Sequence, residues 1–256
     1  MKKNYFDLTG KVALVTGASS GLGVQFAKAL ANQGADIAIC ARRRDKLEAV
    51  KKEVEEYGVK CYVHSCDVTK VEDIKTTVQD VLAHYGKIDI LVNNAGLGWG
   101  EPAETQSDEV WKTMIDTNLN GVYYFAREVG RSMVEKGYGK IINIGSIHSS
   151  VAMVGSPISA YCTTKGAVAM MTKALANEWA KKGITVNAIG PAYFASEMTA
   201  SVIDTPEFRA MLPICCPMGR PGQPGELDGA LIYFASDASS YTTGQLLTVD
   251  GGWTTN

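Results

Sequence analysis

The sequence lacks the features that mark several common classes of protein. Its 256 residues carry a formal net charge of -2, so no basic surface for nucleic acid is expected. No stretch reaches the roughly 18 uninterrupted apolar residues that span a membrane. Asp7 and Gly10 interrupt the N-terminal segment before the apolar core of a signal peptide could form. We therefore expect neither a membrane nor a nucleic acid as partner.

Cysteine and histidine are too few and too scattered to predict a metal site. The six cysteines form no CxxC pair, and the three histidines do not stand at metal-ligand spacing. We expect no bound metal, and we expect unpaired thiols in a reducing cytoplasm. Cys162 is next to a candidate catalytic tyrosine, but no pattern assigns it a role.

Short apolar runs alternate with helical patterns along the chain. Seven runs have the length and composition of buried strands, at 11–17, 35–41, 60–68, 87–96, 139–146, 184–191 and 244–252. Helical patterns lie between them, at 23–34, 44–58, from Thr69 onward, 107–137, 161–183 and 225–236. Thr69 and Glu72 have the spacing of a capping box.

This alternation predicts an α/β fold. We expect a single doubly wound Rossmann-type domain over residues 1–256, with about seven parallel strands and helices on both faces. Such sheets bind ligands at the carboxyl ends of their strands. The stretch 191–225 is rich in proline, methionine and aromatic residues, and we expect it to form a substrate lid.

The stretch "TGASSGLG" (16–23) lies between the first strand and the first helix. Its glycines permit a tight turn, and the helix N-terminus offers free N–H groups to a pyrophosphate. This placement predicts a nucleotide site formed by Gly17, Ser19, Ser20, Gly21, Leu22 and Gly23.

The second strand ends in "CARRR", where NAD-binding folds commonly carry an acidic residue for the ribose hydroxyls. This sequence has Ala41 there, followed by Arg42 and Arg43. An arginine suits a 2′-phosphate, so NADP(H) is favoured over NAD(H). The alternative is a solvated charged run at the start of a helix.

Two further stretches follow predicted strands. Asp67, in "CDV", could accept a hydrogen bond from adenine or could simply be a turn residue. "NNAG" (93–96) places small residues where a cofactor would lie. The same residues are equally typical of an ordinary turn after a strand.

Tyr161 and Lys165, in "YCTTK", are four residues apart, so on a helix they share one face. They could be an ordinary surface pair. They could also be a proton donor and a cation that lowers the pKa of the donor below the usual value of about 10.

Together these motifs resemble the short-chain dehydrogenase/reductase family. The resemblance covers about residues 10–253 and rests on "TGASSGLG", "CDV", "NNAG", "TNLNG", "NIGS", "YCTTK" and "NAIGP", which occur in the family's order. It implies a nicotinamide cofactor and a homotetramer or homodimer built partly through the helices 107–137 and 161–183. It also implies a catalytic tetrad of Asn118, Ser146, Tyr161 and Lys165.

The resemblance assigns roles to these residues. Tyr161 would donate or accept the proton, Ser146 would hold the substrate oxygen, and Asn118 would anchor a water that links Lys165 to solvent. The cofactor would contact Asp67, Val68, Asn93, Ala95, Gly96, Tyr161, Lys165, Pro191, Phe194 and Ser196, in addition to the glycine loop and the two arginines.

The expected substrate pocket is mainly apolar. We expect substrate contacts from Ser146, Tyr161, Trp99, His148 and Tyr193, and a wider lining from Met153, Val154, Phe194, Met198, Phe208 and Met211. This set favours a neutral, bulky ketone or a hydroxysteroid. Arg209 and Arg220 flank the lid, so a substrate that carries a carboxylate is not excluded.

Other readings of the chain stay open at this point. The sequence is similar in style to gluconate 5-dehydrogenases, which act on sugar acids, and to 3-oxoacyl-carrier-protein reductases. From other classes, a non-catalytic NADP-binding regulator and an α/β methyltransferase remain possible, although the latter would not explain "YCTTK".

Overall fold

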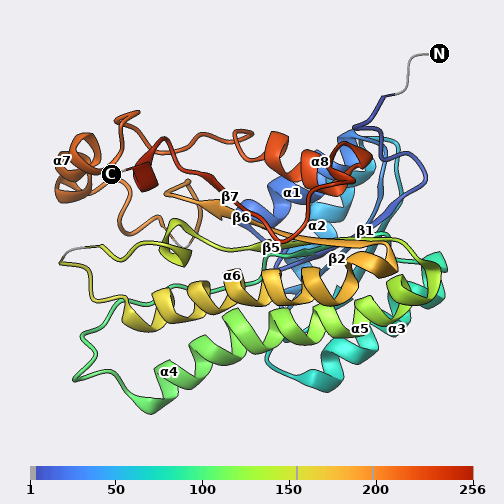
Figure 1. Ribbon diagram of the computed structural model, residues 1–256, viewed down its shortest axis with the longest axis horizontal. Helices are drawn as coiled ribbons and strands as arrows, with labels where there is room; N and C mark the ends of the chain where they lie inside the picture. The colour runs from blue at the N-terminus through green and yellow to red at the C-terminus, as the bar shows by residue number, and fades with distance from the viewer. Residues whose placement is uncertain (1–3, 154, 198, 256) are drawn as a thin grey trace.

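The computed structural model describes residues 4–153, 155–197 and 199–255, and it has the predicted α/β architecture (Figure 1). Seven parallel strands form one sheet in the order β3-β2-β1-β4-β5-β6-β7. Their bounds are Val12–Thr16 (β1), Asp36–Ala41 (β2), Cys61–Ser65 (β3), Ile90–Asn93 (β4), Gly139–Ile144 (β5), Ile184–Pro191 (β6) and Leu246–Val249 (β7). The doubly wound fold is therefore confirmed.

Helices cover both faces of the sheet, as the apolar strands require. Their bounds are Gly21–Asn32 (α1), Arg44–Glu55 (α2), Val71–Tyr85 (α3), Asp108–Ile115 (α4), Gly121–Lys136 (α5), Ser159–Trp179 (α6), Pro206–Cys215 (α7) and Asp228–Ala235 (α8). One hydrophobic core joins the sheet to α1, α2 and α8, and a second joins it to α3, α5 and α6. These two cores fix the strand ends that form the site.

One prediction of local structure was wrong: the capping box is absent, because α3 begins at Val71 and the Thr69 hydroxyl donates to Asp67 instead. The helical region expected over 107–137 is present, with a π-helical turn, Asp116–Asn120, between α4 and α5. The lid also contains a helix, α7, that the sequence pattern did not indicate; Pro213 lies inside it.

The lid packs at the end of the sheet where the strands carry their carboxyl termini. In Figure 1, α7 and the C terminus lie at the same end of the molecule. Phe208 and Leu212 of α7 pack with Ile147 and Trp253 in a small separate core. The lid is therefore anchored beside the loops that follow β5 and β7.

No helix in the described ranges is long and apolar enough to cross a membrane. Among the same residues, no group of three or more histidine, cysteine and acidic side chains could hold a metal ion. All six cysteines are free thiols.

Candidate active site

A groove of about 1440 Å³ runs along the carboxyl ends of the strands. This volume exceeds the roughly 300–1,000 Å³ of a typical small-ligand pocket, so it has room for a dinucleotide and a substrate. The groove is lined by most of the residues predicted for the site: Gly17, Ser19, Ser20, Gly21, Leu22, Arg42, Arg43, Asp67, Val68, Ala95, Gly96, Trp99, Ser146, His148, Tyr161, Lys165, Pro191, Tyr193, Phe194 and Ser196. Three predicted residues lie beneath it instead: Gly23, Asn93 and Asn118.

The glycine loop has the geometry that a pyrophosphate needs. Gly17 and Gly21 have φ of 67° and 57°, a backbone conformation that favours glycine. The helix that follows, α1, has no acidic residue in its first turn, and Ser20 at its N-cap leaves the first N–H groups without a side-chain partner. These N–H groups and the positive end of the helix dipole fit an anionic phosphate.

Gly23 serves packing and does not line the groove. A Cβ atom there would lie 2.4 Å from the Gly17 carbonyl oxygen and 2.6 Å from Asn94 Nδ2. Glycine at this position therefore lets α1 approach the loop that follows β1. Gly23 was predicted to line the cofactor site; in the structure it supports that site only indirectly, through the packing of α1.

The assignment of Asn93 to the cofactor was also wrong. Its side chain is buried and donates to Asn143 Oδ1 at 2.9 Å in the interior of the sheet. The next residue, Asn94, lines the groove and donates to the carbonyl oxygens of Thr16 and Gly17. Asn94 was missed, because sequence alone does not show which asparagine of the pair faces the groove.

Asp67 is a turn residue in this structure. Its Oδ1 accepts hydrogen bonds from the backbone N–H and the hydroxyl of Thr69, at 3.1 and 2.8 Å. Burial raises the pKa of Asp67, but these bonds, together with the charges of Arg42 and Lys70, outweigh burial and hold the pKa below its usual value. Asp67 also lines the groove, so the contact with adenine stays a prediction.

Ser146 and Tyr161 meet at the centre of the groove. Ser146 follows β5, and its hydroxyl accepts a hydrogen bond from the backbone N–H of His148 at 3.1 Å. Tyr161 lies in the first turn of α6. Burial raises the pKa of Tyr161 to about 12, and a hydrogen bond with the Ser146 hydroxyl opposes this effect. The phenol is therefore protonated at neutral pH and can donate a proton.

Lys165 lies one helical turn below Tyr161. Its Nζ is 5.7 Å from the centre of the Tyr161 ring and donates to the Ile144 carbonyl at 2.8 Å. Burial lowers the pKa of Lys165 to about 8. The net pKa of Tyr161 therefore lies above the usual value rather than below it, because burial of the phenol dominates its pKa.

Asn118 lies in the π-helical turn and is fully buried. Its Oδ1 accepts from the Leu97 N–H, and its Nδ2 donates to the Leu97 carbonyl, both at 2.8 Å. Nδ2 also donates to Thr164 Oγ1 at 3.2 Å, and that hydroxyl donates to the Tyr161 carbonyl. Asn118 therefore joins the "NNAGL" loop to the first turn of α6, and both its amide hydrogens are used.

Arg43 lines the groove and is the N-cap residue of α2. Its guanidinium donates to the hydroxyls of Ser19 and Ser20 and to Glu197 of the lid. Lys46, one turn along α2, forms a second ion pair with Glu197 at 2.9 Å. The charged run was recognised in the sequence, but Lys46 and Glu197 were missed.

Among the predicted substrate residues, His148 has a distinct setting. Its ring is buried and stands edge-on to Tyr161, with the ring centres 6.0 Å apart. Nδ1 lies 3.0 Å from the Val151 carbonyl oxygen. Because a carbonyl only accepts, Nδ1 carries the hydrogen and Nε2 is an acceptor. Burial lowers the pKa of His148, so the neutral ring dominates at pH 7.

The rest of the predicted pocket is brought together where it can be described. Trp99, Met153, Tyr193, Phe194, Phe208 and Met211 all line the groove. Val154 and Met198 lie outside the described residues. Arg209 and Arg220 do not line the groove, and each forms an ion pair, with Asp204 and Glu226 respectively.

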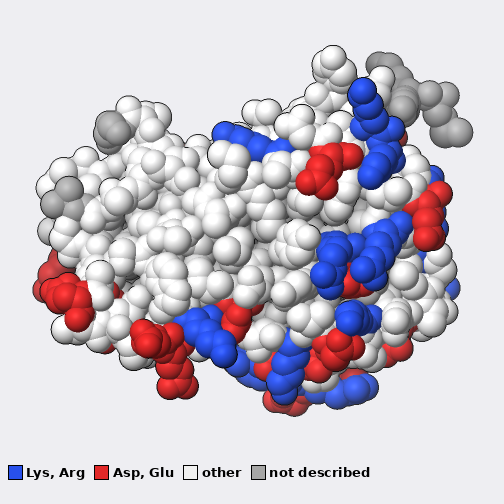
Figure 2. Space-filling view, turned by 60° about the horizontal axis from the view of Figure 1, so that its bottom comes forward, with Lys and Arg blue, Asp and Glu red and all other residues white. Residues whose placement is uncertain are grey.

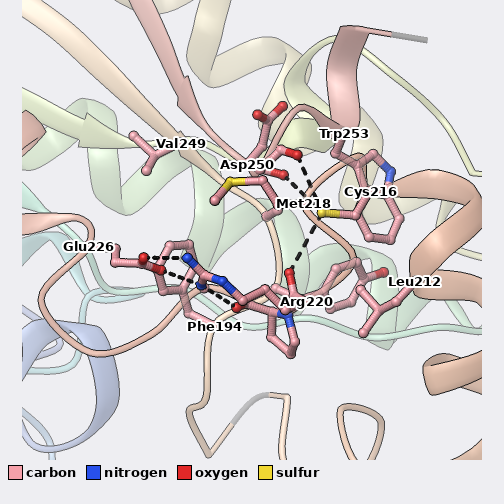
Figure 3. Close-up of a pocket in the computed structure, with 14 residues that line it drawn as sticks. Phe194, Leu212, Cys216, Met218, Arg220, Glu226, Val249, Asp250 and Trp253 are labelled. Atoms are coloured by element: carbon pink, nitrogen blue, oxygen red, sulfur yellow. Dashed lines mark hydrogen bonds and ion pairs between the residues drawn. The ribbon is translucent and has the colours of Figure 1, made fainter.

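A smaller pocket of about 310 Å³ lies behind the lid (Figure 3). The Arg220–Glu226 ion pair borders it, and Cys216 Sγ donates toward the carbonyl oxygens of Arg220, Asp250 and Gly251. Its charged side chains, Arg220, Glu226 and Asp250, are thus already paired within the chain. We regard it as support for the lid and place the chemistry in the larger groove.

Comparisons with known proteins agree with this geometry. The family model described as enoyl-(acyl carrier protein) reductase matches residues 17–254. The chain belongs to the short-chain dehydrogenase/reductase family. It is 41% identical to gluconate 5-dehydrogenase of Gluconobacter oxydans (strain 621H), over 97% of this chain and 96% of that protein. It is 39% identical to a probable NADP-dependent mannitol dehydrogenase of Yarrowia lipolytica, over 97% and 89%.

A solved structure is similar over almost the whole chain. The gluconate 5-dehydrogenase of Burkholderia cenocepacia J2315, in complex with NADP and tartrate, superposes with a TM-score of 0.94 at 38% identity, over 98% of both chains. This chain is accordingly an oxidoreductase of that family that acts on CH–OH groups and binds a nicotinamide cofactor.

Proposed function

We propose that this enzyme interconverts a ketone and a secondary alcohol in a polyhydroxylated substrate, a sugar acid or a polyol, with NADP(H). His148 carries the choice of substrate. Its Nε2 makes no hydrogen bond to any described residue and borders the groove next to Tyr161. An acceptor that faces the groove can take a hydrogen bond from a bound substrate, and a second hydroxyl on the substrate provides the donor.

This proposal replaces the neutral bulky ketone or hydroxysteroid that the apolar lining favoured. Many ketosteroids have no hydroxyl group next to the reacting carbon, whereas ketoses and keto sugar acids do. The gluconate and mannitol dehydrogenases among the relatives also favour hydroxyl-rich substrates. Because Arg209 and Arg220 are paired and lie outside the groove, neither is placed to bind a carboxylate.

NADP(H) is the proposed cofactor because of the charge at the end of β2. No acidic residue follows that strand until Asp45, whereas Arg42 and Arg43 both line the groove. Guanidinium groups suit a 2′-phosphate. The residues that would hold the rest of the cofactor are the glycine loop, Asp67 and Val68, Ala95 and Gly96, Lys165, and Pro191, Phe194 and Ser196.

Four residues of the chain and the cofactor have separate roles in the proposed reaction. The nicotinamide supplies or accepts the hydride. Ser146 and Tyr161 hydrogen-bond the substrate oxygen, and Tyr161 gives it a proton during reduction. The protonated Lys165 stabilises the phenolate that this transfer leaves. Asn118 positions the loop and α6 through its side chain, and the water that it would anchor near Lys165 stays a prediction.

A substrate panel tests the proposal. We expect NADPH-linked reduction of fructose, sorbose and 5-ketogluconate, with weaker activity toward ketosteroids and 3-oxoacyl thioesters. His148→Leu should raise KM for the ketoses, whereas His148→Gln, which keeps an acceptor, should raise it less. A preference for ketosteroids, or equal KM values for both variants and the parent, would contradict the assignment. NADPH binding without turnover across the panel would revive the non-catalytic regulator.

A further inference from the structure

The carboxylate of Glu197 lies among donors from the opposite side of the groove. Its Oε2 accepts from Ser20 Oγ at 2.9 Å and from Arg43 Nη2 at 3.0 Å. Its Oε1 accepts from Lys46 Nζ at 2.9 Å. Glu197 belongs to the lid, which follows β6, whereas its partners lie 151 to 177 residues earlier in the chain. One side chain thus joins the lid to the cofactor end of the groove.

These donors form a cradle for an anion. Arg43 also donates to Ser19 Oγ at 3.1 Å, which fixes its guanidinium beside the glycine loop. Two cations and one hydroxyl surround a single carboxylate, so the cluster keeps an excess positive charge. The hydrogen bonds and charges of Arg43 and Lys46 hold the pKa of Glu197 at about 2, so it stays ionised at neutral pH.

We propose that Glu197 is a cofactor-discriminating residue, whose carboxylate takes the position of the 2′-phosphate in the cradle of Arg43, Lys46 and Ser20. This inference rests on the proposed preference for NADP(H). A cofactor with a 2′-phosphate displaces Glu197 and gains both cations. A cofactor without one leaves the ion pairs in place.

Displacement of Glu197 has a structural consequence. Its neighbour Ser196 lines the groove, and Ser196 bonds to Thr199 within the same lid segment. Breaking the two ion pairs frees this segment from α2 and from the glycine loop. The choice of cofactor is thereby coupled to the position of the lid.

The opposite role for Glu197 makes a different prediction. If Glu197 holds Arg43 and Lys46 in the geometry that a phosphate needs, its removal weakens phosphate binding. If Glu197 competes with the phosphate, its removal strengthens binding. The sign of the change in affinity therefore decides between competition and support.

Binding of two adenine nucleotides isolates this effect from the chemistry. 2′,5′-ADP and 5′-AMP differ only in the 2′-phosphate, and calorimetry measures both at about 0.1 M salt, where charge screening is moderate. We expect Glu197→Gln to bind 2′,5′-ADP roughly three- to tenfold more tightly than the parent, as removal of an ion-paired competitor allows. Its affinity for 5′-AMP should change less than about twofold.

Two matched variants complete the experiment. Asp204→Asn removes another lid carboxylate that is ion-paired, to Arg209, outside the groove, and should leave both affinities unchanged. In an Arg43→Gln background, Glu197→Gln should lose most of its effect, because the competition acts mainly through Arg43.

The outcomes separate this inference from the proposed function. If the parent and Glu197→Gln both bind 2′,5′-ADP no better than 5′-AMP, the NADP(H) preference itself is wrong, and the competitor role falls with it. If 2′,5′-ADP is preferred but Glu197→Gln binds it equally well or more weakly, the preference stands and Glu197 is not a competitor.

Discussion

Replacing Asn118 with alanine should separate the "NNAGL" loop from α6. The variant loses three hydrogen bonds, two with Leu97 and one with Thr164. Each such bond contributes about 1 kcal/mol net, and the buried partners left behind add to the loss. We therefore expect the free energy of unfolding to fall by about 3–5 kcal/mol, and Tm by roughly 6–20 °C in a protein of this size.

Thermal unfolding of purified protein, followed by circular dichroism, measures this change. The control is Asn120→Ala in the same π-helical turn, where one half-buried hydrogen bond to Asp116 is lost. We expect that variant to lose less than about 1.5 kcal/mol. If Tm fell by the same small amount in both variants, the view that Asn118 connects the loop to α6 would be refuted.

The same variant also tests how Asn118 serves catalysis. Thr164 connects Asn118 to the backbone carbonyl of Tyr161, so the loss reaches the first turn of α6. We expect kcat to fall by at least about tenfold, because small misplacements of reacting groups carry costs of this size. A normal kcat in a destabilised protein would show that Asn118 serves stability alone.

Three further predictions concern packing, pH and assembly. Gly23→Ala should destabilise the protein and weaken cofactor binding in calorimetry, because the new Cβ would lie 2.4 Å from the Gly17 carbonyl oxygen. The control Gly229→Ala places its Cβ in open space and should leave stability and cofactor affinity unchanged. The kcat/KM for reduction should fall as the pH rises past about 8, where Lys165 loses its charge while Tyr161 keeps its proton; a flat profile to pH 10 would contradict this. The expected homotetramer or homodimer should dissociate in light scattering when Met170, which is exposed on α6, becomes Glu; an unchanged mass would place the interface elsewhere.

The surface gives some support to that last prediction. Figure 2 shows the molecule from the side of α4 and α5, with charged side chains along the lower edge and the right-hand end, and a largely uncharged area in the centre and upper left. Trp111, Tyr123 and Met170 expose large apolar side chains on α4, α5 and α6. Exposed apolar patches of this kind often mark protein interfaces. The oligomeric state and the cytoplasmic location stay predictions.

Much of the fold could be predicted from the sequence because its signal is local. Seven apolar runs alternate with amphipathic segments, and each run became a parallel strand. Glycines at 17 and 21 required a turn that few other residues adopt. Tyr161 and Lys165 are fixed on one face by helical spacing alone. These features depend on residues within a few positions of one another.

The remaining features depend on contacts between distant segments. Which of Asn93 and Asn94 faces the groove is set by where β4 ends. Glu197 reaches Arg43 from a lid position 154 residues further along the chain, and no local pattern shows that contact. The pKa of Tyr161 follows from its burial, which the spacing to Lys165 cannot reveal. In each case, tertiary packing decides what the local pattern leaves open.

The central claim is that Tyr161 protonates the carbonyl of a hydroxyl-rich substrate. Steady-state reduction of fructose and 5-ketogluconate by Tyr161→Phe, with NADPH affinity measured separately, tests it most directly. We predict a loss of about 10²–10⁴-fold in kcat, the usual contribution of a general acid, with the Kd for NADPH nearly unchanged. A variant that keeps more than about a tenth of the parent's kcat would contradict the account.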